Sequence, residues 1–173
     1  YYCSGIRVVD GQKIRCWKAK GHGSISFAEG VAESCNCVFM DSALAMGTEG
    51  VYDYLNASGL RSETGVDVPG ETSGIFIAEE SVKSVALARI GFGQAVAVTP
   101  IGMLTAAASV VDGGRLVTPH LLSEVRDSYS GQTVKGEFAG RGRTVSESTS
   151  GPRRTLLANA VQHGRGKRAE VPG

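Results

Sequence analysis

The stretch FAEGVAESCNCVFMDSALAMG, residues 27–47, places two helical patterns on either side of Ser34-Cys35-Asn36. The first covers residues 27–33, and the second covers residues 41–46 and ends at Gly47, because glycine breaks helices. If the backbone turns sharply at this junction, the Ser34 hydroxyl and the Asn36 amide both project into one cleft. A Ser-x-Asn tripeptide also has a plain structural interpretation, a helix interruption with side-chain to backbone hydrogen bonds. Its meaning therefore depends on the sequence around it.

Helical patterns continue from this junction, and we predict a helical region over residues 25–112. Its clearest helix opens at Thr99-Pro100, because threonine caps a helix and proline fits the first helical position. Residues 1–17 are typical of a β-hairpin with a tight turn at Asp10-Gly11. Small strands are predicted within residues 115–135, and a last helix over residues 148–163. The expected fold class is therefore α+β and helix-rich.

The composition is that of an ordinary soluble globular protein, with 42% hydrophobic and 20% charged residues. The net charge of +1 does not favour binding to polyanions. The sequence contains no run of about 18 apolar residues, the length that spans a membrane. It begins at Tyr1 rather than Met and stops at Val171-Pro172-Gly173, so we expect an internal piece of a longer protein.

The order of motifs along the whole chain resembles the transpeptidase domain of class B penicillin-binding proteins. The likeness is greatest to the sporulation and cell-division members of Gram-positive bacteria, which carry a comparable Cys-containing hairpin before Gly-His-Gly. The segments that carry it are Ile14-Arg15-Cys16-Trp17, Gly21-His22-Gly23, Ser34-Cys35-Asn36-Cys37-Val38-Phe39, Thr64-Gly65-Val66-Asp67-Val68-Pro69-Gly70-Glu71, Gly91-Phe92-Gly93-Gln94, Val98-Thr99-Pro100, Asp112-Gly113-Gly114 and Thr118-Pro119. In that family, helices pack on both sides of a five-stranded antiparallel sheet. The resemblance implies that residues 1–173 hold mainly the helical part and lack most of the sheet.

The resemblance also implies a serine acyl-transfer site. These enzymes use three motifs, Ser-x-x-Lys, Ser-x-Asn and Lys-Thr-Gly, and Ser34 and Asn36 match the second. By carry-over, the Ser34 hydroxyl relays a proton between the lysine beside the nucleophile and the leaving amine. Asn36 binds the peptide substrate or a β-lactam side chain, and Cys35 has no catalytic role. Neither of the other motifs occurs in the 173 residues, so we expect no activity from this chain alone.

For the longer protein, the resemblance implies a D,D-transpeptidase that cross-links peptidoglycan stem peptides ending in D-Ala-D-Ala. It would bind penicillin and other β-lactams, work with other cell-wall synthesis proteins and require no cofactor. It would lie on the extracytoplasmic face of the membrane, anchored by an N-terminal segment outside this sequence. Two alternatives stay open: a β-lactamase or β-lactam sensor with the same motifs, and a non-catalytic interaction module on the same scaffold.

The four cysteines allow a disulfide or a metal site. No Cys-x-x-Cys pair is present and Cys-x-Cys at a helix end is a poor zinc clamp, so no metal is expected. With a two-residue turn at Asp10-Gly11, Cys3 becomes a diagonal neighbour of Cys16 on one face of the hairpin. We therefore predict a Cys3–Cys16 disulfide, which an extracytoplasmic location would permit.

Two remaining features have simple interpretations. His22 is interpreted as a structural or surface residue. A basic cluster near the C-terminus lacks the interleaved aromatic residues of nucleic-acid-binding segments, so no nucleic-acid partner is expected. The cluster consists of Arg153, Arg154, Arg165, Lys167 and Arg168. Because helices such as residues 100–111 would pack against absent sheet strands, we also expect exposed apolar surface and self-association of the chain.

Overall fold

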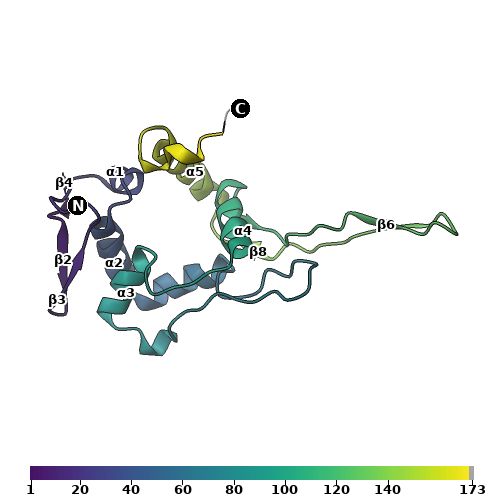
Figure 1. Cartoon of the computed structure of the whole chain (residues 1–173), viewed down its shortest axis with the longest axis horizontal. Helices are drawn as coiled ribbons and strands as arrows, with labels where there is room; N and C mark the ends of the chain where they lie inside the picture. The colour runs from purple at the N-terminus through teal and green to yellow at the C-terminus, as the bar shows by residue number, and fades with distance from the viewer. Residues whose placement is uncertain (172–173) are drawn as a thin grey trace. The chain divides into compact units, whose positions relative to one another are not determined.

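The computed structural model describes residues 1–171 (Figure 1). These residues form two units. Of these described residues, unit 1 comprises Tyr1–Asp53, Phe76–Val96 and residues 151–171, and unit 2 comprises Tyr54–Ile75 and Ala97–Ser150. Two helices, α2 (Asn36–Ala57) and α5 (Glu147–Gln162), contribute residues to both units.

Unit 1 begins with two small antiparallel ladders. Its strands are β1 (Tyr2–Cys3), β2 (Ile6–Val9), β3 (Gln12–Arg15) and β4 (Gly23–Ser24). In the β2–β3 hairpin Val9 lies opposite Gln12, so Asp10 and Gly11 form a two-residue turn, both with positive φ. Strand β1 is not part of this hairpin: it pairs with β4, which places Cys3 opposite Gly23.

The helices of unit 1 are α1 (Phe27–Ala32), α2 up to Asp53, α3 (Ser84–Gly91) and α5 from Gly151, together with the 3-10 turns η1 (Glu79–Ser81) and η2 (Arg165–Ala169). A capping box starts α1, in which Ser26 and Glu29 each satisfy a backbone N–H of the other. Gly47 has non-helical backbone angles inside α2, so this helix consists of two segments divided at the predicted breaker.

Close contacts between helices define the core of unit 1. A Cβ on Gly30 of α1 would lie 2.7 Å from the Val38 side chain of α2, so only glycine fits there. Gly91 of α3 approaches the backbone of Phe39 and the side chain of Ala43 in the same way. The core of buried residues consists of Cys3, Val9, Ile14, Cys16, Cys35, Cys37, Val38, Met40 and Ala88. All four cysteines are therefore core residues.

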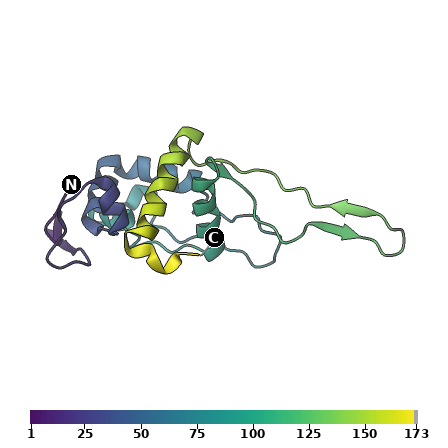
Figure 2. The same ribbon diagram turned by 90° about the horizontal axis from the view of Figure 1, so that it is seen from above.

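Unit 2 contains α4 (Pro100–Val111) and the strands β5 (Arg115–Leu116), β6 (Glu124–Arg126), β7 (Thr133–Lys135) and β8 (Gly142–Arg143). The Thr99 hydroxyl caps α4 by accepting from the Gly102 N–H at 3.2 Å. Strand β5 pairs with β8, and the β6–β7 hairpin projects beyond the rest of the unit (Figures 1 and 2).

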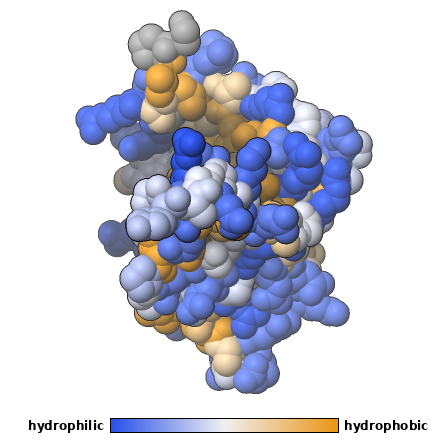
Figure 3. Space-filling model, turned by 90° about the vertical axis from the view of Figure 1, so that its right-hand side faces the viewer, coloured by the Kyte–Doolittle hydropathy of each residue, from blue (hydrophilic) through white to orange (hydrophobic). Residues whose placement is uncertain are grey.

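Unit 2 also exposes large apolar side chains, among them Ile75, Leu121 and Val134. Figure 3 shows hydrophobic side chains lying in separate groups among hydrophilic ones on one face of the chain.

Two carboxylates order the segment 64–71 of unit 2. Glu71 accepts hydrogen bonds from the backbone N–H and the hydroxyl of Thr64 and from the N–H of Gly65, at 2.5–2.8 Å. Asp67 accepts from the N–H groups of Leu121 and Leu122, at 2.8 and 2.7 Å. Burial raises the pKa of Glu71, but these hydrogen bonds outweigh it and hold that pKa below its ordinary value. Both carboxylates are structural acceptors.

We predict that Gly30→Ala destabilises the chain, although alanine is normally the better helix former. The new Cβ would overlap Val38, which is fully buried, and such overpacking costs about 1–3 kcal/mol. The matched control is Gly50→Ala in α2, where the nearest atom lies 3.7 Å away and a gain of roughly 0.5–1 kcal/mol is expected. Urea unfolding of both variants measures the difference. Equal stabilisation by both substitutions would contradict the close α1–α2 contact.

We predict that Glu71→Gln lowers stability at pH 7 by about 1–2 kcal/mol, because an amide cannot accept all three hydrogen bonds. Since the pKa of Glu71 is lower in the folded chain, its contribution is complete above the ordinary value of 4.5 and is lost as the pH falls below it. The variant should therefore lose less stability than the unmodified chain on acidification. Thermal unfolding between pH 3 and pH 7 tests this, with Glu63→Gln as an exposed control. Parallel stability profiles for Glu71→Gln and the unmodified chain would contradict it.

Candidate active site

Ser34 lies in a sharp turn between α1 and α2. Helix α1 ends at Ala32, Ser34 has a left-handed backbone with φ of 50°, and α2 begins at Asn36. The indole N–H of Trp17 donates to the backbone carbonyls of both Glu33 and Ser34, at 3.0 Å each. The Ser34 side chain is exposed. The turn that the sequence required for a Ser-x-Asn site is therefore present, and Trp17 holds its backbone.

The Asn36 side chain is held by the same N-terminal segment that contains Trp17. Its side-chain N–H donates to the Arg15 carbonyl at 3.1 Å, which links the first turn of α2 to the end of β3. The guanidinium of Arg165 stacks over the Trp17 ring, 3.8 Å from its centroid. Residues 15–17 thus form a brace along the Ser34–Asn36 segment, a role for Trp17 that the sequence pattern did not reveal.

Beneath this segment, the side chain of Cys35 joins a cluster that the sequence analysis missed. The sulfur atoms of Cys3, Cys16 and Cys35 and a ring nitrogen of His22 all lie within 4.8 Å of one another. Gly5 lies opposite Cys16, and its carbonyl accepts from the Cys16 N–H at 2.8 Å. All four cysteines of the chain are free thiols in the structure, so the Cys3–Cys16 disulfide stays a prediction for the oxidised chain.

The cluster gives its thiols different acidities. Burial raises the pKa of the Cys35 thiol to about 11, and it also raises the pKa of Cys37. Burial alone would raise the pKa of Cys3 as well. Hydrogen bonds from the side chain and backbone of His22 and from the Gly5 backbone outweigh it and lower that pKa to about 6. Of these three thiols, Cys3 therefore carries a negative charge more readily than Cys35 and Cys37.

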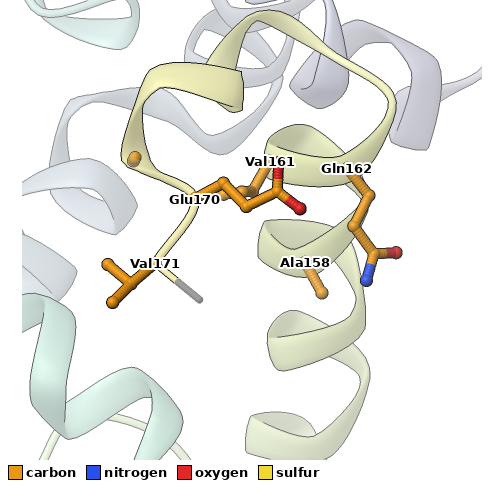
Figure 4. Close-up of a pocket in the computed structure, with 6 residues that line it drawn as sticks. Ala158, Val161, Gln162, Glu170 and Val171 are labelled. Carbon is orange, nitrogen blue, oxygen red and sulfur yellow. The ribbon is translucent and has the colours of Figure 1, made fainter. Parts of the chain in front are cut away.

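Two pockets lie elsewhere in the chain. One, of about 330 Å³, is lined in unit 1 by Ala158, Val161, Gln162, Ala169, Glu170 and Val171 (Figure 4). The other, of about 550 Å³, is lined in unit 2 by Asp112, Arg115, Leu116, Val117, Gly140, Gly142 and Arg143. Neither of these two pockets includes Ser34 or Asn36.

Known proteins resemble all or most of the chain. It is 37% identical to Stage V sporulation protein D of Bacillus subtilis, over 100% of this chain and 27% of that protein. It is 30% identical to peptidoglycan D,D-transpeptidase MrdA of Salmonella typhimurium, over 69% of this chain and 20% of that protein. The chain thus spans about a quarter of the length of the first relative and a fifth of the second.

Solved structures show the same fold. Penicillin binding protein 3 of Mycobacterium tuberculosis, complexed with aztreonam, matches with a TM-score of 0.89 at 23% identity, over 100% of this chain and 40% of that one. Penicillin Binding Protein 2X of Streptococcus thermophilus matches with a TM-score of 0.82 at 27% identity, over 92% of this chain and 23% of that one. The predicted helix-rich α+β fold is confirmed.

Within residues 1–171, no helix combines the length and apolar character needed to cross a membrane.

All 173 residues match the family of the penicillin binding protein transpeptidase domain. The resemblance found in the motif order is therefore confirmed, and the chain belongs to this family.

Proposed function

We propose that this chain is the Ser-x-Asn part of a serine D,D-transpeptidase that cross-links peptidoglycan stem peptides ending in D-Ala-D-Ala. The observation that carries the proposal is the braced turn at Ser34–Asn36, which keeps a hydroxyl exposed beside a carboxamide in a chain of this family. The protein containing it would act in sporulation or cell division, with other cell-wall synthesis proteins, at the extracytoplasmic face of the membrane. The names of two relatives, a sporulation protein and a D,D-transpeptidase, support this.

In this proposal, Ser34 and Asn36 have separate roles. The Ser34 hydroxyl accepts a proton from one group and passes it to the leaving amine, since a hydroxyl can donate and accept at once. A carboxamide has two N–H donors. The hydrogen bond to Arg15 uses one of them and orients the Asn36 side chain, so the other can bind the substrate backbone or a β-lactam.

In this proposal, the nucleophile and part of the oxyanion hole come from outside this sequence. Its six lysines are Lys13, Lys18, Lys20, Lys83, Lys135 and Lys167, and none follows a serine by three residues or precedes Thr-Gly. A serine hydroxyl without an adjacent base is a weak nucleophile. A β-lactamase or a β-lactam sensor would need the same missing motifs. The relatives named D,D-transpeptidases favour the transpeptidase over these alternatives and over a non-catalytic module.

We predict that benzylpenicillin forms no covalent adduct with this chain but acylates the full-length protein. In that protein, Ser34→Ala should slow acylation by about 10²–10⁴-fold, the usual contribution of a proton-transfer group. The matched control is Ser81→Ala, an exposed serine of η1, which should change nothing. Intact-mass spectrometry detects the adduct, and fluorescent penicillin gives the rate. A stable adduct on Ser34 of this chain would contradict the proposal, because Ser34 would then be the nucleophile.

We predict that Trp17→Phe in the full-length protein slows acylation by roughly tenfold, because it removes the indole N–H and keeps an aromatic ring at this position. The melting temperature should change little, since Trp17 is partly exposed. Arg165→Gln removes the stacked cation but leaves the indole hydrogen bonds, so it serves as the matched control with a much smaller effect. Equal rates for Trp17→Phe and the unmodified protein would show that the brace has no part in positioning Ser34.

A further inference from the structure

Four side chains with metal-binding atoms converge under the Ser34–Asn36 segment from four separate places in unit 1. Cys3 lies in β1, Cys16 follows β3, His22 precedes β4 and Cys35 lies between α1 and α2. Their donor atoms all lie within 4.8 Å of one another. The three cysteines are at most 5% exposed, so water competes little for their sulfur atoms.

The spacing of these atoms suits a tetrahedral zinc ion. Zinc bonds of about 2.3 Å to sulfur and 2.0–2.1 Å to nitrogen put two sulfur ligands about 3.8 Å apart and a sulfur and a nitrogen about 3.6 Å apart. The observed distance from Cys16 Sγ to His22 Nδ1 is 3.8 Å. The other pairs need to close by about 1.2 Å at most. Three cysteines and one histidine also form one of the usual donor sets of structural zinc sites.

The imidazole of His22 meets the Trp17 ring edge-on, with ring centroids 5.2 Å apart, and lies beside the thiols of the cluster. Its Nε2 atom is buried without a hydrogen-bond partner within residues 1–171, and its Nδ1 atom faces Cys16. An ion bound through Nδ1 would leave the ring proton on Nε2, so the imidazole can serve as a neutral ligand. Buried cysteines alone are ordinary core residues. A histidine nitrogen among three of them completes a set of four metal donors.

The backbone fixes these donors independently of any ion. Gly5 and Gly21 both have positive φ, and a Cβ on either one would overlap the backbone of the facing segment. The chain around Gly5 and the chain before His22 therefore pack backbone against backbone, which brings the histidine beside Cys3. The N–H of Cys35 donates to the Gly30 carbonyl at 2.8 Å, which sets the position of the third sulfur.

We propose that Cys3, Cys16, His22 and Cys35 bind one Zn²⁺ ion, which fastens the Ser34–Asn36 turn to the N-terminal strands. Binding takes three thiolates and a neutral imidazole, and the thiol protons leave to solvent. No electron transfer is involved. The site does not depend on the proposed transpeptidase activity, because it needs only residues of this chain.

The test is the metal content and Co²⁺ spectrum of the chain purified with a non-thiol reductant. We expect about one Zn²⁺ per chain, and after exchange a tetrahedral Co²⁺ spectrum with strong sulfur-to-metal charge-transfer bands. Cys16→Ala, His22→Ala and Cys35→Ala should each lower the affinity by more than the roughly 10- to 100-fold that outer-shell changes cause. Cys37→Ala is the matched control: it removes an equally buried cysteine outside the donor set and should keep the full metal content.

Measurements on the unmodified chain cover the case in which a variant does not fold. A chelator should lower its melting temperature, and added Zn²⁺ should restore it. Three results would overturn the proposal: metal content well below one ion per chain, octahedral Co²⁺ without sulfur bands, or equal metal loss from Cys37→Ala and Cys35→Ala. A reduced chain that takes up no Zn²⁺ and forms a Cys3–Cys16 disulfide in air would assign these thiols to a redox pair instead.

Discussion

Gly30 of α1 lies so close to the Val38 side chain of α2 that only glycine fits at position 30. The rest of the candidate site depends on this contact. Because the two helices are this near, the chain must reverse within Glu33, Ser34 and Cys35, which forces Ser34 into a left-handed conformation. That reversal turns Cys35 into the core while the Ser34 side chain stays exposed. One backbone constraint therefore separates an exposed hydroxyl from a buried thiol in adjacent residues.

The brace of residues 15–17 gives this turn its stability on the outside. The Trp17 indole N–H donates to the carbonyls of Glu33 and Ser34. The Asn36 carboxamide donates to the Arg15 carbonyl, so three hydrogen bonds join the brace to the turn that follows α1. Inside, Cys35 meets residues from β1, the end of β3 and the loop before β4. The proposed proton relay and the proposed zinc site therefore share one short segment but use opposite sides of it.

The sequence predicted the features that depend on neighbouring residues. The turn at Asp10-Gly11, the helix break at Gly47 and the Thr99 cap of α4 each follow from local backbone preferences, and the structure contains all three. The thiol cluster could not be predicted this way, because it depends on the β1–β4 pairing and on the backbone contact between Gly5 and Gly21. A search for Cys-x-x-Cys pairs assumes ligands from one segment, whereas these come from four. Likewise, nothing in the sequence of residues 64–71 shows that the Glu71 carboxylate accepts hydrogen bonds from Thr64.

The central claim is that the Ser34–Asn36 turn forms one wall of an acyl-transfer site. The most direct test is a crystal structure of the full-length protein acylated by a β-lactam. The account predicts that the Asn36 side-chain nitrogen donates to the β-lactam side chain at about 2.9–3.2 Å, with the Ser34 hydroxyl within hydrogen-bond reach of the lysine beside the acylated serine. An acylated serine whose lysine and β-lactam contact neither Ser34 nor Asn36 would contradict the account.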